Sequence, residues 1–349
     1  MKSVRIGSKK IGPGKSCYII AEAGINHNGD LSLAEKMIRT AHKAGADAVK
    51  FQTFSAERLT TRTAKKAKYQ LRATGSCESQ YEMLKKVELS YDDFRRLSVI
   101  AKRTGIEFLS SPFDKESADL LESLGIAAYK IPSGELTNLP LLEYIAGFHK
   151  PVILSTGMAD MGEIRESVRV LKQAGQKDII LLHCITNYPA PLESLNLRVI
   201  ETLRDTFHAP TGFSDHSAGI TASLLARTLG ACVIEKHFTL DRNLPGPDHA
   251  ASLEPAGLAD LVAQVRLADL ALGDGKKTIG RDESAIRRVA RKSLIAGVTI
   301  KKGEKLTDEM IFIKRPGTGI PPKFFHEVLG RRARRTIRKD TVIRWEMLT

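Results

Sequence analysis

Two apolar segments of the sequence end in side chains that can act as acids, bases and metal ligands. The segment ACVIEKH (231–237) closes with a glutamate, a lysine and a histidine, and the segment PTGFSDH (210–216) closes with a serine, an aspartate and a histidine. Enzymes use carboxylates and imidazoles to move protons and to hold divalent cations. A soluble core needs no such groups, so both segment ends are candidates for a functional site.

Six further apolar segments also end in polar side chains: 18–22, 47–53, 107–111, 127–133, 151–156 and 178–187. The polar residues that close the eight segments are Glu22, Lys50, Gln52, Ser110, Ser111, Lys130, Ser133, Ser155, Thr156, His183, Asn187, Ser214, Asp215, His216, Glu235, Lys236 and His237. Any one of them alone is typical of a helix cap or a hydrogen-bonded core residue. Eight segments that end this way predict a pocket lined with polar groups.

The spacing of these segments predicts the elements that position the polar groups. Amphipathic stretches separate the segments, for example LSLAEKMIRTAHKAG (31–45) and YDDFRRLSVIAKRTG (91–105), and several end in the glycine expected just past a helix. Eight strands alternating with helices over about 250 residues predict an α/β fold, the (β/α)8 TIM barrel, whose active sites lie at the C-terminal ends of the strands. The alternative is an open doubly wound sheet, which would have GxGxxG after its first strand, and EAGINHNG does not supply it.

Two lysines at the ends of different strands predict an anionic ligand. Lys50 and Lys130 suit a doubly anionic substrate, because an ammonium group is a good partner for phosphate or carboxylate. Serine and threonine at neighbouring strand ends would complete a phosphate cradle. The alternative is a structural ion pair with Glu22 or Glu135.

His216 and His237 close adjacent segments, so they could meet on one divalent metal. Two imidazoles with carboxylate or water ligands suit manganese, iron or zinc and leave positions open for substrate oxygens. The alternative is two hydrogen-bonded core histidines. His27, His183 and His249 are weaker candidates.

The bulk composition describes a globular protein of 349 residues with 42% hydrophobic residues. Four cysteines lie far apart without a CxxC pair, which favours neither a disulfide framework nor a zinc knuckle and indicates a reducing cytoplasm. No run approaches the roughly 18 apolar residues of a membrane span. We therefore expect a cytoplasmic protein without a membrane partner.

The net charge of +14 is concentrated near the C-terminus. Residues 281–349 hold 18 Lys and Arg against 8 Asp and Glu, a net charge of +10. A basic segment can bind nucleic acid, face an anionic small molecule or simply be solvated. Aromatic residues are only 6% and no nucleic-acid-binding motif is present, so we expect no nucleic-acid partner.

Composition also divides the chain. We expect a barrel domain over residues 1–272 and a polar, charged linker with a helical piece over 273–292. Residues 293–349 are rich in β-branched residues and turns and predict a small β-rich domain.

Several motifs resemble the sialic acid synthase family, whose members make nine-carbon nonulosonic acids. The motifs are, in chain order, IAEAGINHNGD, AVKFQTF, KIPSGELTNLPLL, LSTGMA, GFSDHSAG and IEKHFTLDRNLPGPDHAAS. RKSLIAG and KRPGTGI resemble the family's C-terminal antifreeze-like SAF domain, a β-clip fold. The resemblance spans nearly the whole chain, and GFSDHS combined with EKHFTLD and GPDH is highly specific.

The resemblance implies that phosphoenolpyruvate condenses with an open-chain N-acetylmannosamine-type sugar and water, releasing phosphate. Glu22 would act as general base on the attacking water or the sugar hydroxyl. His216 and His237 would hold a divalent metal, Mn2+ first, with Mg2+ or Co2+ as alternatives. The residues implied to bind substrate are Lys50, Ser110, Lys130, Ser133, Ser155, Asn187, Tyr188, Ser214, Asp248 and Arg315, with Tyr188 and Asp248 near the sugar.

Arg315, in KRPG, resembles the family arginine that reaches into the site of a partner subunit, which implies a domain-swapped homodimer. Some members of the family use an asparagine in the loop after the second strand, and the stretch from Gln70 to Leu84 has none. The expected product is N-acetylneuraminate. The alternatives are a legionaminate or pseudaminate synthase that uses a 2,4-diacetamido hexose, and an enzyme that uses a phosphorylated sugar. More distant readings are a 3-deoxy sugar-acid phosphate synthase and a non-catalytic binding protein.

Overall fold

The computed structural model describes residues 2–75 and 78–349 of the chain. The chain consists of two compact units, Met1–Asp274 and Gly275–Thr349. Part of the loop after the second strand, residues 76–77, lies outside the described residues.

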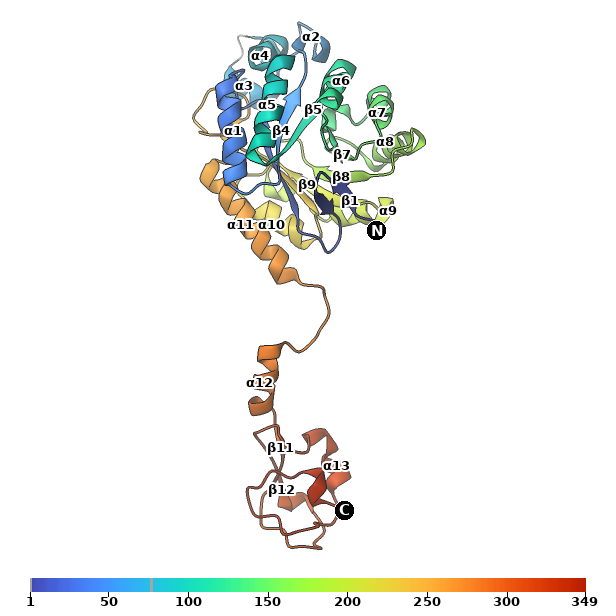
Figure 1. The fold of residues 1–349 in the computed structure, drawn as a ribbon, viewed down its shortest axis with the longest axis vertical. Helices are drawn as coiled ribbons and strands as arrows, with labels where there is room; N and C mark the ends of the chain where they lie inside the picture. Colours follow the sequence, from blue (N-terminus) through green and yellow to red (C-terminus); the bar gives the residue numbers. More distant parts are fainter. Residues whose placement is uncertain (1, 76–77) are drawn as a thin grey trace. The chain divides into compact units, whose positions relative to one another are not determined.

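The first unit is an eight-stranded parallel barrel surrounded by helices (Figure 1). Its strands are β3 (Tyr18–Gly24), β4 (Ala48–Thr53), β5 (Glu107–Pro112), β6 (Tyr129–Ile131), β7 (Val152–Ser155), β8 (Ile179–Cys184), β9 (Thr211–Asp215) and β10 (Val233–His237). Their order is β5-β4-β3-β10-β9-β8-β7-β6, and β5 and β6 lie beside each other where the barrel closes. All eight strands that the sequence predicts are confirmed.

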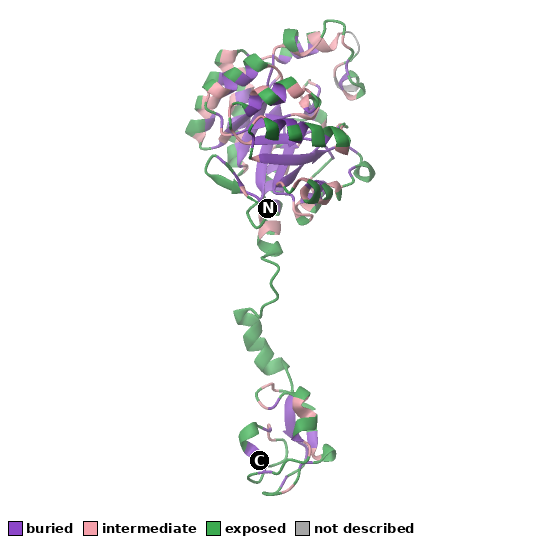
Figure 2. Ribbon diagram, turned by 90° about the vertical axis from the view of Figure 1, so that its right-hand side faces the viewer, coloured by how far each residue is buried: buried purple, intermediate pink, exposed green. Residues whose placement is uncertain are grey.

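Helices connect the strands and cover the outside of the barrel. They are α1 (Leu31–Lys43), α2 (Ala56–Leu59), α3 (Lys68–Thr74), α4 (Gln80–Val87), α5 (Tyr91–Thr104), α6 (Lys115–Ser123), α7 (Leu139–Ala146), α8 (Met161–Gln173), α9 (Val199–Phe207), α10 (Thr221–Thr228) and α11 (Pro255–Leu272), with short 3-10 turns η1 (Ser133–Glu135), η2 (Leu192–Ser194) and η3 (His249–Ala251). Local capping fixes several helix starts; Asp30 accepts from the backbone of α1, and Ser90 and Asp93 cap α5 reciprocally. Figure 2 shows buried strands inside and exposed outer helix faces.

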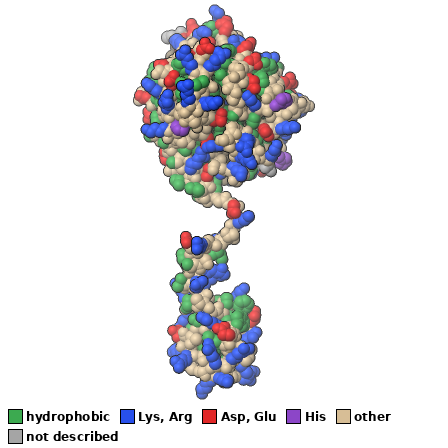
Figure 3. Space-filling model, viewed as in Figure 1, with side chains coloured by type: hydrophobic (Ala, Val, Ile, Leu, Met, Phe, Trp, Pro, Cys, Tyr) green, Lys and Arg blue, Asp and Glu red, His purple; other side chains and the backbone are tan. Residues whose placement is uncertain are grey.

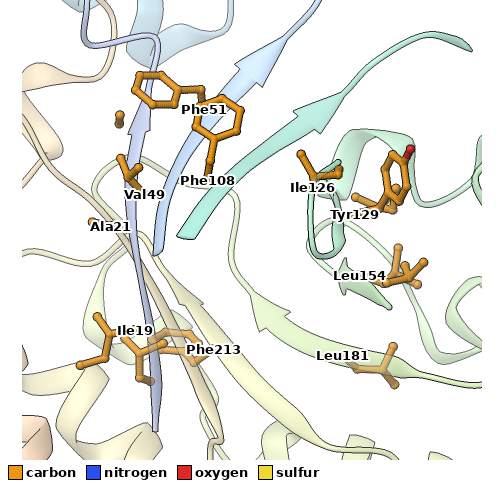
Figure 4. Packing of buried hydrophobic residues seen from close by; sticks show 14 of the residues in the cluster. Ile19, Ala21, Val49, Phe51, Phe108, Ile126, Tyr129, Leu154, Leu181 and Phe213 are labelled. Carbon is orange, nitrogen blue, oxygen red and sulfur yellow. The ribbon is translucent and has the colours of Figure 1, made fainter. Parts of the chain in front are cut away.

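Two apolar layers hold the barrel together, one on each side of the sheet. The outer layer packs the strands against the helices, and Figure 4 shows part of it, including the stacked rings of Phe51 and Phe108. The inner layer lies at the N-terminal ends of the strands. An antiparallel hairpin of β1 (Val4–Ile6) and β2 (Lys9–Ile11) packs against that inner layer. This hairpin was not predicted from the sequence.

The second unit is a small β-rich domain. It contains α12 (Arg281–Ala290), β11 (Ser293–Ala296), β12 (Ile311–Lys314), α13 (Phe325–Val328) and the 3-10 turns η4 (Asp308–Met310), η5 (Pro322–Phe324) and η6 (Trp345–Met347). Strands β11 and β12 pair antiparallel, and a separate apolar core lies beneath them. Figure 3 shows Lys and Arg side chains spread over the visible surface of this unit. Among the residues that the model describes, no helix is long and apolar enough to cross a membrane.

Candidate active site

A cavity of about 160 Å³ lies inside the barrel at the C-terminal ends of the strands. Its lining residues are Glu22, Lys50, Gln52, Ser111, Phe113, Lys130, Pro132, Ser133, Gly134, Ser155, Met158, Cys184, Thr186, Tyr188, Ser214, His216, Glu235 and His237. A hollow of about 450 Å³ lies beside the hairpin at the opposite end, but its lining contains neither histidine nor a pair of buried lysines. The chemistry of the lining therefore places the candidate site in the smaller cavity.

Strand alternation decides which residues of the two opening motifs enter this cavity. Successive side chains of a strand point to opposite faces. Ser214 and His216 therefore face inward with Glu235, whereas Asp215 and Lys236 face the helices and form a buried ion pair at 2.9 Å. The expectation that every strand-end residue lines the pocket is wrong for this outward pair.

The two lysines lie at the centre of a buried network of charges. Lys50 Nζ lies 2.7 Å from Glu22 Oε2 and 3.2 Å from Ser111 Oγ. Lys130 Nζ lies 2.7 Å from Ser155 Oγ and 3.4 Å from Glu235 Oε1. The ion pair with Glu22 that the sequence left open is thus formed, and a pair with Glu135 is not, because Glu135 accepts from Asn138 instead.

Burial gives the two carboxyl groups of this network different proton affinities. Burial raises the pKa of Glu22 to about 7, and the charge of Glu235 adds to the shift while the nearby Lys50 opposes it. Burial also acts against ionisation of Glu235, but Lys130 and Lys50 outweigh it and lower the pKa of Glu235 below its usual value. One carboxylate therefore stays ionised near neutral pH, and the other can gain or lose a proton there.

The two histidines meet, as predicted, with ring centroids 5.5 Å apart. Nδ1 of His216 donates to the Ile185 carbonyl at 2.8 Å, and the Tyr188 hydroxyl lies 3.0 Å from Nε2, which is an acceptor when this imidazole is neutral. Burial, helped by His216 and nearby lysines, lowers the pKa of His237 well below its usual value. The imidazole of His237 is therefore neutral, and its buried Nδ1 has no hydrogen-bond partner.

This donor set fits a divalent metal held by two imidazole ligands. Within the described residues, no group of three or more His, Cys, Asp or Glu side chains is placed to hold a metal. His216 and His237 could each supply a nitrogen, and the other coordination positions would fall to substrate oxygens or water. With only two protein ligands, such a metal site would be open.

Three predicted substrate-binding residues do not line the cavity in the first unit. Ser110 faces outward, where its Oγ lies 2.7 Å from Thr53 Oγ1, and Ser111 lines the cavity in its place. Asn187 is exposed in the loop after β8. Asp248 is buried near Tyr188 and His216 without lining the cavity, and burial raises its pKa to about 6 although His216 opposes the shift.

The remaining predicted residues are divided between the two units. Glu22, Lys50, Lys130, Ser133, Ser155, Tyr188, Ser214, His216 and His237 line the cavity together. Arg315 is an exposed residue of the second unit.

Comparison with known proteins gives a family for this arrangement. The model of the NeuB family matches residues 37–277. The chain belongs to the NeuB family. A SAF domain model matches residues 291–349, which confirms the predicted kind of C-terminal domain.

Relatives of this NeuB-family chain match it over nearly its whole length. It is 50% identical to the N,N'-diacetyllegionaminic acid synthase of Campylobacter jejuni (95% of this chain and 99% of the relative) and 45% identical to that of Legionella pneumophila (97% of each). The crystal structure of the sialic acid synthetase of Leptospira borgpetersenii in complex with citrate matches with a TM-score of 0.74 and 36% identity (82% of this chain and 95% of that chain). The chain is therefore an enzyme of the phosphoenolpyruvate-dependent nonulosonic acid synthase class.

Several cavity residues of this NeuB-family enzyme were placed at strand ends from the sequence but were given no role in the site. Glu235 was visible at a strand end, but nothing in the sequence showed that it bridges two lysines. Ser111 and Gln52 could have been chosen by alternation, because each lies two residues beyond an inward position of its strand. Cys184 follows the same alternation, two residues after Leu182 on β8, whereas Thr186 lies in the loop beyond that strand and carries no comparable signal.

Proposed function

We propose that the enzyme condenses phosphoenolpyruvate with a 2,4-diacetamido hexose and water to form N,N'-diacetyllegionaminate and phosphate. The observation that carries the proposal is the pairing of Lys50 and Lys130 in one buried cavity with the His216–His237 pair. The identity to two N,N'-diacetyllegionaminic acid synthases over nearly the whole chain favours this acceptor over N-acetylmannosamine.

The lysine side of the cavity suits phosphoenolpyruvate. Its phosphate and carboxylate need several donors, and two ammonium groups and the hydroxyls of Ser111, Ser155 and Ser214 converge there. Ser133 adds a hydroxyl, which accepts from the Gly157 amide at 3.0 Å. Charge-assisted hydrogen bonds of this kind are stronger than neutral ones, so this side would carry most of the anion affinity.

The histidine side suits the acceptor sugar. Tyr188 offers the edge of its ring and its hydroxyl to the cavity. Asp248, which lies behind the lining, has a buried carboxyl oxygen without a hydrogen-bond partner. A Mn2+ ion, or Mg2+ or Co2+ in its place, held by His216 and His237 would supply polarisation of the sugar aldehyde. The protein's own contribution here is to orient the open-chain sugar with its aldehyde carbon toward the lysine side.

Glu22 lies between the two sides and is placed to move a proton. Carbon 3 of phosphoenolpyruvate would attack the aldehyde carbon, and water would add at carbon 2 while a Glu22 carboxylate oxygen accepts the water proton. Glu22 would return that proton to the oxygen of the former aldehyde, which becomes a hydroxyl. The bond between carbon 2 and the bridging oxygen would then break as the hydroxyl on carbon 2 becomes a carbonyl, and phosphate would leave with the bridging oxygen and the released proton. A carboxyl pKa of about 7 suits a group that takes up a proton and releases it near neutral pH.

The proposal also covers the role of Arg315, the oligomeric state and the cellular location of the enzyme. Arg315 would reach the acceptor in the site of a partner subunit of a domain-swapped homodimer, and the basic second unit would face a site filled with anions. We also propose that the enzyme works in the cytoplasm.

The test is phosphate release from phosphoenolpyruvate by the Mn2+-loaded full-length enzyme with three acceptors. We expect fast release with a 2,4-diacetamido hexose and release at least about tenfold slower with N-acetylmannosamine or its 6-phosphate, which corresponds to about 1.4 kcal/mol of discrimination. A preference for N-acetylmannosamine would make the enzyme an N-acetylneuraminate synthase. No release with any of the three from folded, metal-loaded protein would overturn the proposed function.

A further inference from the structure

We infer that Tyr69, in the loop after the second barrel strand, is a positioning residue that holds Tyr188 against His216 and thereby sets the affinity for the acceptor sugar. The inference rests on the proposed function, and it supplies a role for the loop whose contribution the sequence left without a residue.

Three aromatic rings form a column beside the cavity. The rings of Tyr69 and Tyr188 stack at a centroid distance of 4.8 Å and an interplanar angle of 28°. Tyr188 stacks in turn on His216 at 4.1 Å and 30°. Two nearly parallel neighbours at such distances must lie on opposite faces of the Tyr188 ring, so Tyr69 closes the face that His216 leaves open.

Tyr188 is the member of the column that faces the acceptor. It lines the cavity, its hydroxyl lies 3.0 Å from His216 Nε2, and its ring meets His237 edge-on at 5.6 Å. Tyr69 does not line the cavity and is half-buried behind Tyr188. It therefore acts on the acceptor through its neighbours, and the ring contact with Tyr188 is the direct one.

Polar contacts fix the chain both before and after Tyr69. Gln70 is buried, and its side chain accepts from the Ala67 amide at the start of α3. The buried ammonium of Lys66 lies 3.4 Å from Glu78, which also pairs with Lys86 of α4. A ring fixed in this way can hold another ring in place, whereas a ring on a loose loop could not.

The column lies apart from the residues that would hold phosphoenolpyruvate. The anion-binding groups come from the strand interior, where Lys50 and Lys130 each pair with Glu235. The rings of Tyr69 and Tyr188 take no part in these ion pairs. Loss of Tyr69 would free the Tyr188 ring to leave the face of His216. The acceptor would then bind a less ordered surface, and phosphoenolpyruvate would keep its contacts.

The experiment compares Tyr69→Leu with Tyr69→Phe and uses Tyr81→Leu in neighbouring α4 as a matched control, since the Tyr81 hydroxyl contacts Glu57 on the outside of the barrel. We expect Tyr69→Leu to raise the KM for the acceptor about tenfold, the scale of one lost aromatic pair. The KM for phosphoenolpyruvate should stay within about twofold, kcat should change less than the acceptor KM, and Tyr69→Phe and Tyr81→Leu should resemble the wild type.

A second measurement tests the stack without turnover. Melting temperatures of Tyr69→Leu, Tyr188→Leu and the double variant should be non-additive, with the double variant close to Tyr188→Leu, because each single change already breaks the same contact. Additive shifts, equal changes in both KM values, or a Tyr69→Phe enzyme as impaired as Tyr69→Leu would overturn the inference. Absence of turnover by the wild type with every acceptor would instead overturn the proposed function, and the acceptor role of Tyr69 with it.

Discussion

The two ends of the barrel interior differ in chemistry although the same eight strands build both. Along each strand, or just before it in the case of β6, one inward residue is followed two positions later by another. These pairs are Ile20 and Glu22, Ala48 and Lys50, Leu109 and Ser111, Ala128 and Lys130, Ile153 and Ser155, Leu182 and Cys184, Gly212 and Ser214, and Val233 and Glu235. The first residues of the pairs form the lower layer, which belongs to the inner apolar layer that packs on the hairpin. The second residues form the upper layer, which is charged or polar and lines the cavity.

This difference shows that, on one strand, a residue that stabilises the fold and a residue that serves the reaction can lie only two positions apart. The lower layer is so closely packed that a side chain at Gly212 would meet the Val233 carbonyl oxygen at 2.4 Å. The upper layer keeps buried charges that are ion-paired rather than tightly packed. A third step of two residues reaches His216 and His237 at the outer rim. Substitutions at the three levels should therefore have different effects, and four predictions test this.

The largest effect is expected at the outer rim. His216→Ala and His237→Ala should each lower kcat/KM by roughly 10³-fold, because the side chains would hold the metal. Both variants also lose a ring contact with Tyr188, so the melting temperature should fall, and kcat/KM is compared on protein shown to be folded. The matched control is His183→Gln, since His183 faces outward and lies 2.6 Å from the Leu195 carbonyl oxygen. Wild-type turnover that survives thorough chelation would refute the metal role.

A pair of substitutions on one strand compares the lower and upper layers directly. Ile153→Ala should lower the free energy of unfolding by about 2–5 kcal/mol while the folded enzyme keeps its kcat/KM within about threefold. Ser155→Ala, two residues later on β7, should lower kcat/KM by about 10–100-fold with a much smaller loss of stability, because it removes a hydrogen bond from the Lys130 ammonium. Denaturant unfolding and steady-state kinetics on both variants measure the contrast, and equal profiles would abolish it.

The pH dependence tests whether Glu22 in the upper layer acts as a base. Its pKa is raised to about 7, so the ionised fraction falls as the pH drops below that value. For a base, kcat/KM should level off above pH 7 and fall about tenfold per pH unit below it. Glu22→Gln should lose this inflection and keep any that belongs to the phosphate of the substrate. Activity that rises as the pH falls below 7 would mean that Glu22 acts as an acid.

The smallest effect separates two adjacent serines of β5. Ser111→Ala should raise the KM for phosphoenolpyruvate by about three- to tenfold, because Ser111 accepts from Lys50 in the cavity. Ser110→Ala should leave the kinetics unchanged and cost about 1 kcal/mol of stability, because Thr53 loses its partner. Steady-state kinetics with both variants would contradict the orientation of β5 if Ser110→Ala gave the larger KM.

The sequence was sufficient for the strands but not for every side-chain direction. Each barrel strand is a short apolar run with a polar end, so all eight could be found from the pattern. Ser110 was chosen as a substrate-binding residue instead of Ser111, although strand alternation favours Ser111. Leu109 pairs with Lys50 and points inward as Lys50 does, so Ser111, two residues later, also points inward. The hairpin was missed because VRI and KKI are three-residue strands with few apolar positions.

The residues outside the strands were harder to predict for a physical reason. In a loop no periodicity relates neighbouring side chains, so the exposure of Asn187 beside the cavity residues Thr186 and Tyr188 could not be read from spacing. The contact of Tyr69 with Tyr188 joins residues more than a hundred positions apart and depends on the three-dimensional path of the chain.

The most direct test of the upper layer as the phosphoenolpyruvate site is calorimetric binding of phosphoenolpyruvate to the wild type and to Lys130→Met. Lys130 is 2% exposed, and methionine keeps much of its shape without the charge. We predict that the substitution weakens binding by at least about 100-fold, because a buried carboxylate or phosphate loses a charged partner. Equal affinity of the folded variant and the wild type would contradict the account.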